Sequence, residues 1–221
     1  MKKLLLSAFV ICLAGTSIAQ ESPLWMRHCA LSPDGTTIAF TYKGDIYTVP
    51  STGGRATQIT TNPAFDTEPV WSPDSKQIAF ASDRMGSLDV FVVSSEGGAP
   101  QRLTTHSGSE KPVAYKDNKH ILFTANIAPS AEDAGFPSGQ FQQVYEVAVT
   151  GGRPAMFSSM PMECISINKE GVMLYQDKKG YEDYWRKHQV SPIARDIWTY
   201  TPGKNPVYQK QTTFGGEDRE P

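Results

Sequence analysis

The fold is decided by a stretch that occurs twice: Leu31–Phe40 reads LSPDGTTIAF, and 40 residues later Trp71–Phe80 reads WSPDSKQIAF. The similarity continues downstream, because DIY followed by a Gly-Gly pair within 45–54 recurs as DVF followed by Gly-Gly within 89–98. Each copy then closes with a similar run, QITT in the first and RLTT in the second. Self-similarity at a spacing of about forty to fifty residues indicates a repeat architecture.

Two weaker copies keep the same order of parts. In the third, Ile121–Phe123 takes the place of the Ile-Ala-Phe run, and the Gly-Gly pair is at 151–152. In the fourth, Ile165–Gly171 takes the place of the Ser-Pro-Asp-Gly turn, and Asp196–Trp198 that of the next strand. We therefore divide the chain into copies at about 27–61, 62–105, 106–159 and 160–214. A fifth copy begins at 215–221, where Glu217–Pro221 parallels the segments at 66–69 and 110–112.

Within a copy, the residue types predict short antiparallel strands. Ser-Pro-Asp-Gly suits a type I turn, and Gly-Gly supplies the positive φ that a tight hairpin needs. Between the turns lie runs of four to six residues rich in Ile, Val, Phe, Tyr and Thr, which favour a pleated surface. Four strands per repeat, stacked radially, predict an all-β fold: a partial β-propeller of about four blades plus the start of a fifth. A β-sandwich is the alternative, but its strands would not repeat in register.

The N-terminus has the composition of a cleavable export signal. Lys2 and Lys3 precede an uncharged apolar run at 4–14, and small residues at Ser17 and Ala19 fit a cleavage site before Gln20. The run is too short for a permanent membrane span, which takes about 20 residues. We expect residues 1–19 to be a signal peptide, 20–221 to form the incomplete propeller, and the protein to be periplasmic or secreted. A buried first helix is the alternative interpretation.

Charge and cysteine content limit the partners. Loss of Lys2 and Lys3 changes the formal net charge from −2 to −4, and a mildly acidic chain does not suit nucleic-acid binding. Cys29 and Cys164 belong to copies that are not neighbours, so we expect two free thiols rather than a disulfide. We interpret both as small apolar residues of their strands, not as nucleophiles.

The repeat resembles those shared by TolB and the tricorn proteases: Pro-x-Trp-Ser-Pro-Asp-Gly, Ile-Ala-Phe, Ser-Asp-Arg-x-Gly, an Asp-Ile-Tyr-like strand, Gly-Gly and Leu-Thr. Residues 69–105 match nearly all of this pattern, including Ser82–Gly86, although Ser75 replaces the usual Gly. In the fourth copy, Tyr184–His188 and Arg195–Trp198 resemble a segment of exported bacterial tricorn-like proteases. The resemblance covers almost everything after the signal peptide.

This resemblance implies a role in peptide hydrolysis without catalysis in this chain. Tricorn-like proteases carry propellers first, which admit and filter peptides, and then a PDZ-type domain and a serine-peptidase domain that cleaves them. Peptide substrates and the downstream domains of the same polypeptide are then the expected partners, and homo-oligomers are compatible with this role. The resemblance also implies that the chain stops within a fifth repeat as a truncated first part.

The residues themselves show no catalytic motif. No Gly-x-Ser-x-Gly elbow occurs, and Ser138 lacks its spacing. His28, His106, His120 and His188 are isolated, without metal-ligand spacing, and no Gly-rich loop opens a helix to bind phosphate. We therefore expect no cofactor and no metal. We interpret Asp74 and the pair Asp83-Arg84 as parts of turns and strand edges.

Strand alternation predicts where a binding face would lie. The Ser-Pro-Asp-Gly and Gly-Gly turns should share one face, while the second turns and the links between blades share the other. Two long insertions, about 126–140 and 178–195, fall in second turns and bring aromatic and basic side chains of the kind that anchor interfaces. The candidate contact residues are Phe136, Tyr181, Tyr184, Trp185, Arg186, Lys187, His188 and Arg195. They either meet peptide or a neighbouring domain, or pack down to cover the blades.

Two other functions remain open. A stand-alone TolB-like periplasmic binding protein would have a separate domain before the first repeat, whereas here His28–Leu31 is already in register. A propeller lid of a prolyl-oligopeptidase or dipeptidyl-peptidase relative would precede a hydrolase with a Gly-x-Ser-x-Gly elbow. The Ser-Pro-Asp-Gly register and the Trp-Arg-Lys-His segment favour the tricorn-like reading.

Overall fold

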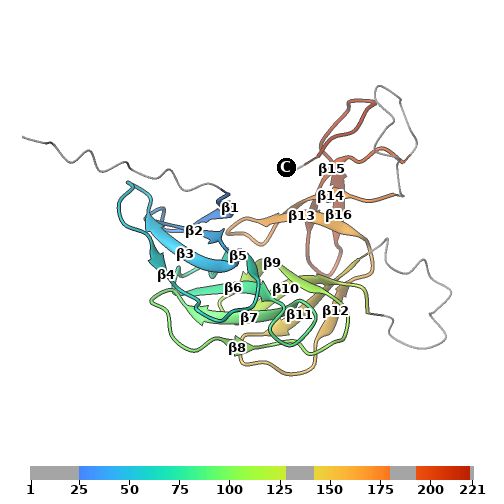
Figure 1. Cartoon of the computed structure of the whole chain (residues 1–221). Coiled ribbons are helices and arrows are strands. Elements are labelled where there is room, and N and C mark those ends of the chain that lie inside the picture. The colour runs from blue at the N-terminus through green and yellow to red at the C-terminus, as the bar shows by residue number, and fades with distance from the viewer. Residues whose placement is uncertain (1–24, 128–141, 180–192, 220–221) are drawn as a thin grey trace, which may run out of the picture.

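The computed structural model describes residues 25–127, 142–179 and 193–219, which form four antiparallel four-stranded sheets (Figure 1). We call these sheets blades 1 to 4. The predicted signal peptide lies outside the described residues. Within the described ranges there is no helix that is long and apolar enough to cross a membrane.

Each blade is a meander in which successive strands pair. Blade 1 contains β1 (Arg27–Leu31), β2 (Thr37–Tyr42), β3 (Asp45–Pro50) and β4 (Thr57–Gln58). Blade 2 contains β5 (Asp66–Trp71), β6 (Gln77–Ser82), β7 (Asp89–Ser94) and β8 (Gln101–Arg102). Blade 3 contains β9 (Glu110–Asp117), β10 (His120–Ala125), β11 (Gln143–Ala148) and β12 (Ala155–Ser158). Blade 4 contains β13 (Met162–Ile167), β14 (Met173–Asp177), β15 (Ile197–Thr201) and β16 (Val207–Lys210).

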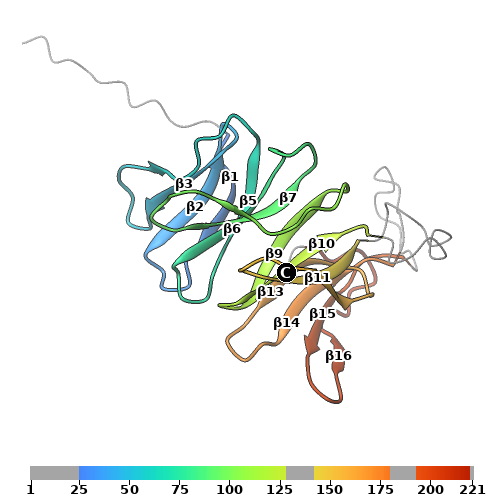
Figure 2. The ribbon, with the colours of Figure 1, turned by 90° about the horizontal axis from the view of Figure 1, so that it is seen from below.

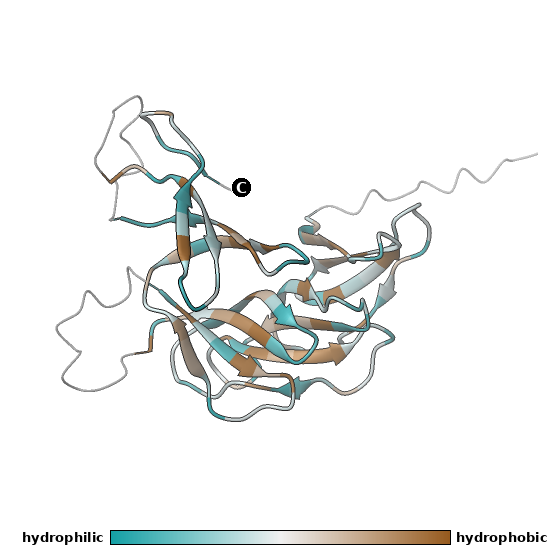
Figure 3. Ribbon diagram, turned by 180° about the vertical axis from the view of Figure 1, so that it is seen from behind, coloured by the Kyte–Doolittle hydropathy of each residue, from teal (hydrophilic) through white to brown (hydrophobic). Residues whose placement is uncertain are grey.

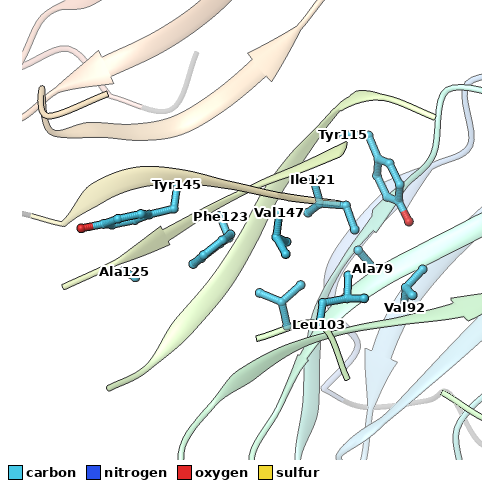
Figure 4. Packing of buried hydrophobic residues seen from close by; sticks show 10 residues of the cluster. Ala79, Val92, Leu103, Tyr115, Ile121, Phe123, Ala125, Tyr145 and Val147 are labelled. Atoms are coloured by element: carbon cyan, nitrogen blue, oxygen red, sulfur yellow. The ribbon is translucent and has the colours of Figure 1, made fainter. Parts of the chain in front are cut away.

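The blades follow one another in an arc with their first strands close together (Figure 2). Three hydrophobic cores hold the arc, one between each pair of consecutive blades (Figure 3). The core between blades 2 and 3 is drawn in Figure 4, where Val92 and Leu103 of one blade meet Ile121 and Phe123 of the next. Since each blade contributes one face to each neighbour, the prediction of a partial β-propeller of about four blades is confirmed.

Aromatic side chains recur at equivalent places in three of the blades. Stacked aromatic pairs join the second and third strands of blades 1, 2 and 3, with ring centroids 5.9, 5.9 and 5.7 Å apart. These pairs are Phe40–Tyr47, Phe80–Phe91 and Phe123–Tyr145. Offset ring contacts at this separation add to the stability gained by burial alone. The weaker third copy thus keeps the packing of the two clear ones.

The Ser-Pro-Asp-Gly turns work as the sequence predicts. The Ser32 hydroxyl donates to Asp34 Oδ1 over 2.6 Å, and the same oxygen accepts the backbone amide of Thr36. The Ser32 hydroxyl is the main cause of the lowered pKa of Asp34. At the fourth position Gly35 has φ +74°, while Ser75 of the second copy adopts φ +59°, a region that glycine occupies at less cost. Asp74 accepts the equivalent bonds, so its structural interpretation is confirmed.

A β-bulge in the first strand corrects one expectation about the cysteines. In blades 1 and 4 the register shifts at the bulge, where His28 and Cys164 have φ +50° and +52°. Neither cysteine forms a disulfide, in agreement with the prediction. Both are exposed, however, so the expectation that they pack as small apolar residues is wrong. The irregular strand turns these positions outward, which alternation alone does not foresee.

One hydrogen bond fixes the entry of the chain into the second, third and fifth repeats. The Asp66 amide donates to Gly44 O and the Glu110 amide to Leu88 O, both over 2.7 Å. The Asp218 amide donates in the same way to Arg195 O, over 2.9 Å. Asp218 therefore makes the linking bond at the place where the sequence predicts that a fifth repeat begins.

Candidate binding surface

Backbone hydrogen bonds establish the two faces of the blades. The first and third turns lie together, because the Ser51 amide donates to Thr36 O and the Ser95 amide to Lys76 O. On the opposite face the second turn meets the link between blades, since the Phe65 amide donates to Asp83 Oδ1 over 2.8 Å. The predicted division into a face of short turns and a face of second turns and links is confirmed. We call the latter the link face.

Most of the predicted contact residues lie outside the described residues. These are Phe136, Tyr181, Tyr184, Trp185, Arg186, Lys187 and His188. Arg195 is described, and its guanidinium lies 3.1 Å from Glu217 and 3.6 Å from Glu163. Arg195 thus connects blade 4 to the residues that follow it. The sequence did not suggest this structural role.

Ion pairs fix the two ends of the insertion in blade 4. Lys179, just before residues 180–192, pairs with Asp196 and lies 3.4 Å from Asp177. Lys210 of β16 reaches the other oxygen of Asp196 over 2.7 Å. Burial opposes ionisation of Asp196, but the bonds from both lysines outweigh it and lower the pKa of the carboxyl. The two ends of the insertion are therefore fixed side by side on the link face.

A cavity of about 470 Å³ opens at the root of the first insertion, between blades 2 and 3. Ile127, the last described residue before 128–141, lies in its wall, and its carbonyl accepts the Tyr145 hydroxyl over 2.8 Å. The other lining residues are Thr105, His106, Glu110, Arg153, Pro154 and Met156. No motif in the sequence points to this cavity, although Glu110 aligns with Asp66 at the start of the repeat.

Glu110 is the unusual group in this cavity. The residue is 1% exposed, and neither carboxylate oxygen has a partner at hydrogen-bond geometry among the described residues. Burial raises the pKa of Glu110 to about 7; the nearby Thr104 hydroxyl and His106 backbone counteract this in part, while the charge of Asp89 adds to it. A buried carboxylate without a partner is costly, and such groups mark candidate functional sites.

A second cavity, of about 520 Å³, lies where the first strands of the four blades meet. Trp71 and Tyr115 occupy equivalent places in its wall. The Trp71 indole donates to Ala30 O over 2.9 Å, whereas the buried Tyr115 hydroxyl has no partner in the described part of the chain. Burial raises the pKa of Tyr115 and keeps the phenol protonated. This axial cavity is a consequence of radial stacking.

The described residues contain no group of three His, Cys, Asp or Glu side chains placed to hold a metal ion. The ion pair of the second repeat is structural: Arg84 binds Asp66 of the first strand, so the interpretation of Asp83-Arg84 as a strand-edge motif is confirmed.

Comparison with known proteins is consistent with this geometry. Residues 23–221 match the family described as the tricorn protease N-terminal beta propeller domain. The chain is 32% identical over 108 residues to "Uncharacterized peptidase YuxL" of Bacillus subtilis, covering 43% of this chain and 16% of that protein. It is 39% identical over 77 residues to "Tricorn protease homolog 1" of Streptomyces coelicolor, covering 35% of this chain and 7% of that protein.

Among solved structures, the crystal structure of the tricorn protease matches with a TM-score of 0.65 and 16% identity. The match covers 89% of this chain and 19% of that one. At this identity the likeness concerns the fold. The chain thus spans a small part of the length of these relatives.

Proposed function

The chain belongs to the tricorn protease N-terminal β-propeller family, and on this premise we propose that it is the non-catalytic, substrate-gating propeller of an exported serine peptidase acting on peptides. The family match over 23–221 is the observation that carries this proposal. The match also favours the tricorn-like hypothesis for the function over the TolB-like and prolyl-oligopeptidase-like alternatives. Downstream PDZ and peptidase domains of the same polypeptide would supply the catalytic residues.

The link face is the surface that we assign to peptide or to the neighbouring domains. Both insertions leave the blades from this face, and in blade 4 two lysines pair with the buried Asp196 at the ends of the insertion. By sequence, the blade 4 insertion carries Tyr184, Trp185 and Arg186, and such side chains dominate the energetics of interfaces. The predicted signal peptide supports an exported protein.

The test replaces Tyr184, Trp185 and Arg186 together by Ala in the full-length protein. We expect peptide turnover to fall about tenfold or more, as anchoring aromatic and Arg residues typically contribute over 1 kcal/mol each, while the melting temperature stays unchanged. The matched control replaces three exposed residues of the opposite face by Ala: Lys76, Glu96 and Lys169. Equal losses of turnover and melting temperature would show that the insertion only covers the blades.

A further inference from the structure

Blades 2 and 3 place a buried carboxylate at the same point of the fold. Asp66 begins β5 opposite Ser82, and Glu110 begins β9 opposite Ala125. Two residues after these partners stand Arg84 in blade 2 and Ile127 in blade 3. The two blades therefore differ in whether the second turn returns a cation to the carboxylate.

In blade 2 the cation fills the site. Arg84 Nη2 lies 3.0 Å from both carboxylate oxygens of Asp66, and the two side chains are 10% and 0% exposed. The guanidinium carbon also lies 4.4 Å from the centre of the Phe91 ring. Blade 2 thus shows how this fold binds a guanidinium: a buried carboxylate pairs with it and an aromatic ring stacks against it.

In blade 3 both binding elements remain, but no cation among the described residues pairs with the carboxylate. Glu110 keeps the carboxylate, and Tyr145 occupies the place of Phe91 in the stacked pair with Phe123. Figure 4 shows the Tyr145 ring at the end of the core cluster, with its hydroxyl pointing away from the other side chains. Because Ile127 replaces Arg84, a cavity of about 470 Å³ lies beside Glu110 and Tyr145.

Among the described residues, no cation forms an ion pair with Glu110. Arg102 is close enough for its charge to lower the pKa of Glu110 in part, but it forms its ion pair with Asp89, over 2.9 Å. The His106 ring accepts the Gly108 amide over 3.0 Å. Arg153 lines the cavity and is exposed, but among the described residues it forms no ion pair with Glu110. Burial outweighs the effect of Arg102 and keeps the pKa of Glu110 raised, to about 7.

We propose that this cavity binds the arginine side chain of a peptide, with Glu110 pairing with the guanidinium and Tyr145 stacking on it as Asp66 and Phe91 do in blade 2. Arginine fits better than lysine, because its planar guanidinium can donate to the carboxylate and stack on the ring at the same time. The inference uses the proposed function only for the source of the arginine, namely a peptide at the link face. The site itself follows from the two blades.

The test measures binding of the peptide Ac-Ala-Arg-Ala-NH2 to the full-length protein by calorimetry at pH 8, where Glu110 is ionised. The control peptide carries citrulline, which keeps the shape and loses the charge. We expect citrulline to bind at least tenfold more weakly. Glu110→Gln should weaken arginine binding by a similar factor, and Ile127→Arg should abolish it by filling the cavity.

Arg153→Ala is the matched control, because it removes an exposed cation at the same cavity and should leave binding unchanged or tighter. Melting temperatures identify variants that fail to fold, and Glu110→Gln answers the question if Ile127→Arg does not fold. Equal affinity for both peptides, or binding unaffected by Glu110→Gln and Ile127→Arg, would overturn the proposal. Calorimetry needs no proteolysis, so its outcome is independent of whether the propeller gates a peptidase.

Discussion

Blades 2 and 3 share a buried carboxylate and a stacked aromatic pair, but within the described part of the chain only blade 2 adds a cation to them. Asp66 is neutralised by Arg84 of its own blade, whereas Glu110 faces Ile127 and a cavity. The hydrophobic pattern of the repeat is preserved in both, so the blades stack alike. The difference shows that a repeat can keep its core and lose one polar partner, which turns a structural ion pair into a candidate binding site.

The largest effect on the free energy of unfolding is expected from Arg84→Ile, which gives blade 2 the residue that blade 3 has at this position. It leaves the fully buried Asp66 without its counterion, and breaking a buried pair in this way costs about 3–5 kcal/mol. Urea unfolding at pH 7.5 measures the loss. The double variant Asp66→Leu/Arg84→Ile removes both charges and should recover much of the stability; a loss below about 1 kcal/mol for Arg84→Ile would show that the pair is not needed.

A smaller effect is expected from a feature that the blades have in common. The Thr60 hydroxyl accepts the Ile46 amide over 3.0 Å, and Thr104 accepts the Val90 amide over 2.9 Å. Thr60→Val and Thr104→Val each leave a buried amide unsatisfied, so we expect each to lower the free energy of unfolding by about 1–2 kcal/mol.

Of these two variants, only Thr104→Val should also change the titration of Glu110, because the Thr104 hydroxyl lowers the pKa of Glu110. Its removal should raise that pKa further, and NMR titration of the Glu110 carboxyl carbon measures the shift. The same shift in Thr60→Val would contradict a local effect, since Thr60 belongs to the other junction.

Much of the fold follows from local patterns in the sequence. The Ser-Pro-Asp-Gly and Gly-Gly turns fix where strands end, and the runs between them fix four strands per repeat. The division into two faces then follows from the alternation of strand direction. Neither the outward position of Cys29 nor that of Cys164 could be predicted, because a bulge in the first strand interrupts the alternation.

Less of the candidate site could be predicted from the sequence. The residues at 136 and 181–188 attract attention as aromatic and basic side chains, but they lie outside the described residues. Glu110 and Ile127 look ordinary alone and become informative only when the second and third copies are aligned pair by pair. The burial of Glu110, which makes its lack of a partner costly, comes from packing between blades.

The carboxyl group of Glu110 also makes the stability of the protein depend on pH. The pKa of Glu110 is raised from 4.5 to about 7 by burial, so the folded state holds its proton more tightly than the unfolded state does. The contribution of protonated Glu110 to the free energy of unfolding is therefore fully present below about pH 4.5. It is lost as pH rises through about 7. Its size is at most about 3 kcal/mol, and Glu110→Gln should remove it.

The most direct measurement is the NMR titration of Glu110 in the wild-type protein and in Ile127→Arg. We predict a pKa of about 7 in the wild type, and a value below the ordinary range of a glutamate in Ile127→Arg, where the new guanidinium takes the place that Arg84 has in blade 2. A wild-type pKa near 4.5, or no change on introducing the arginine, would contradict the claim that blade 3 has a vacant place for a cation.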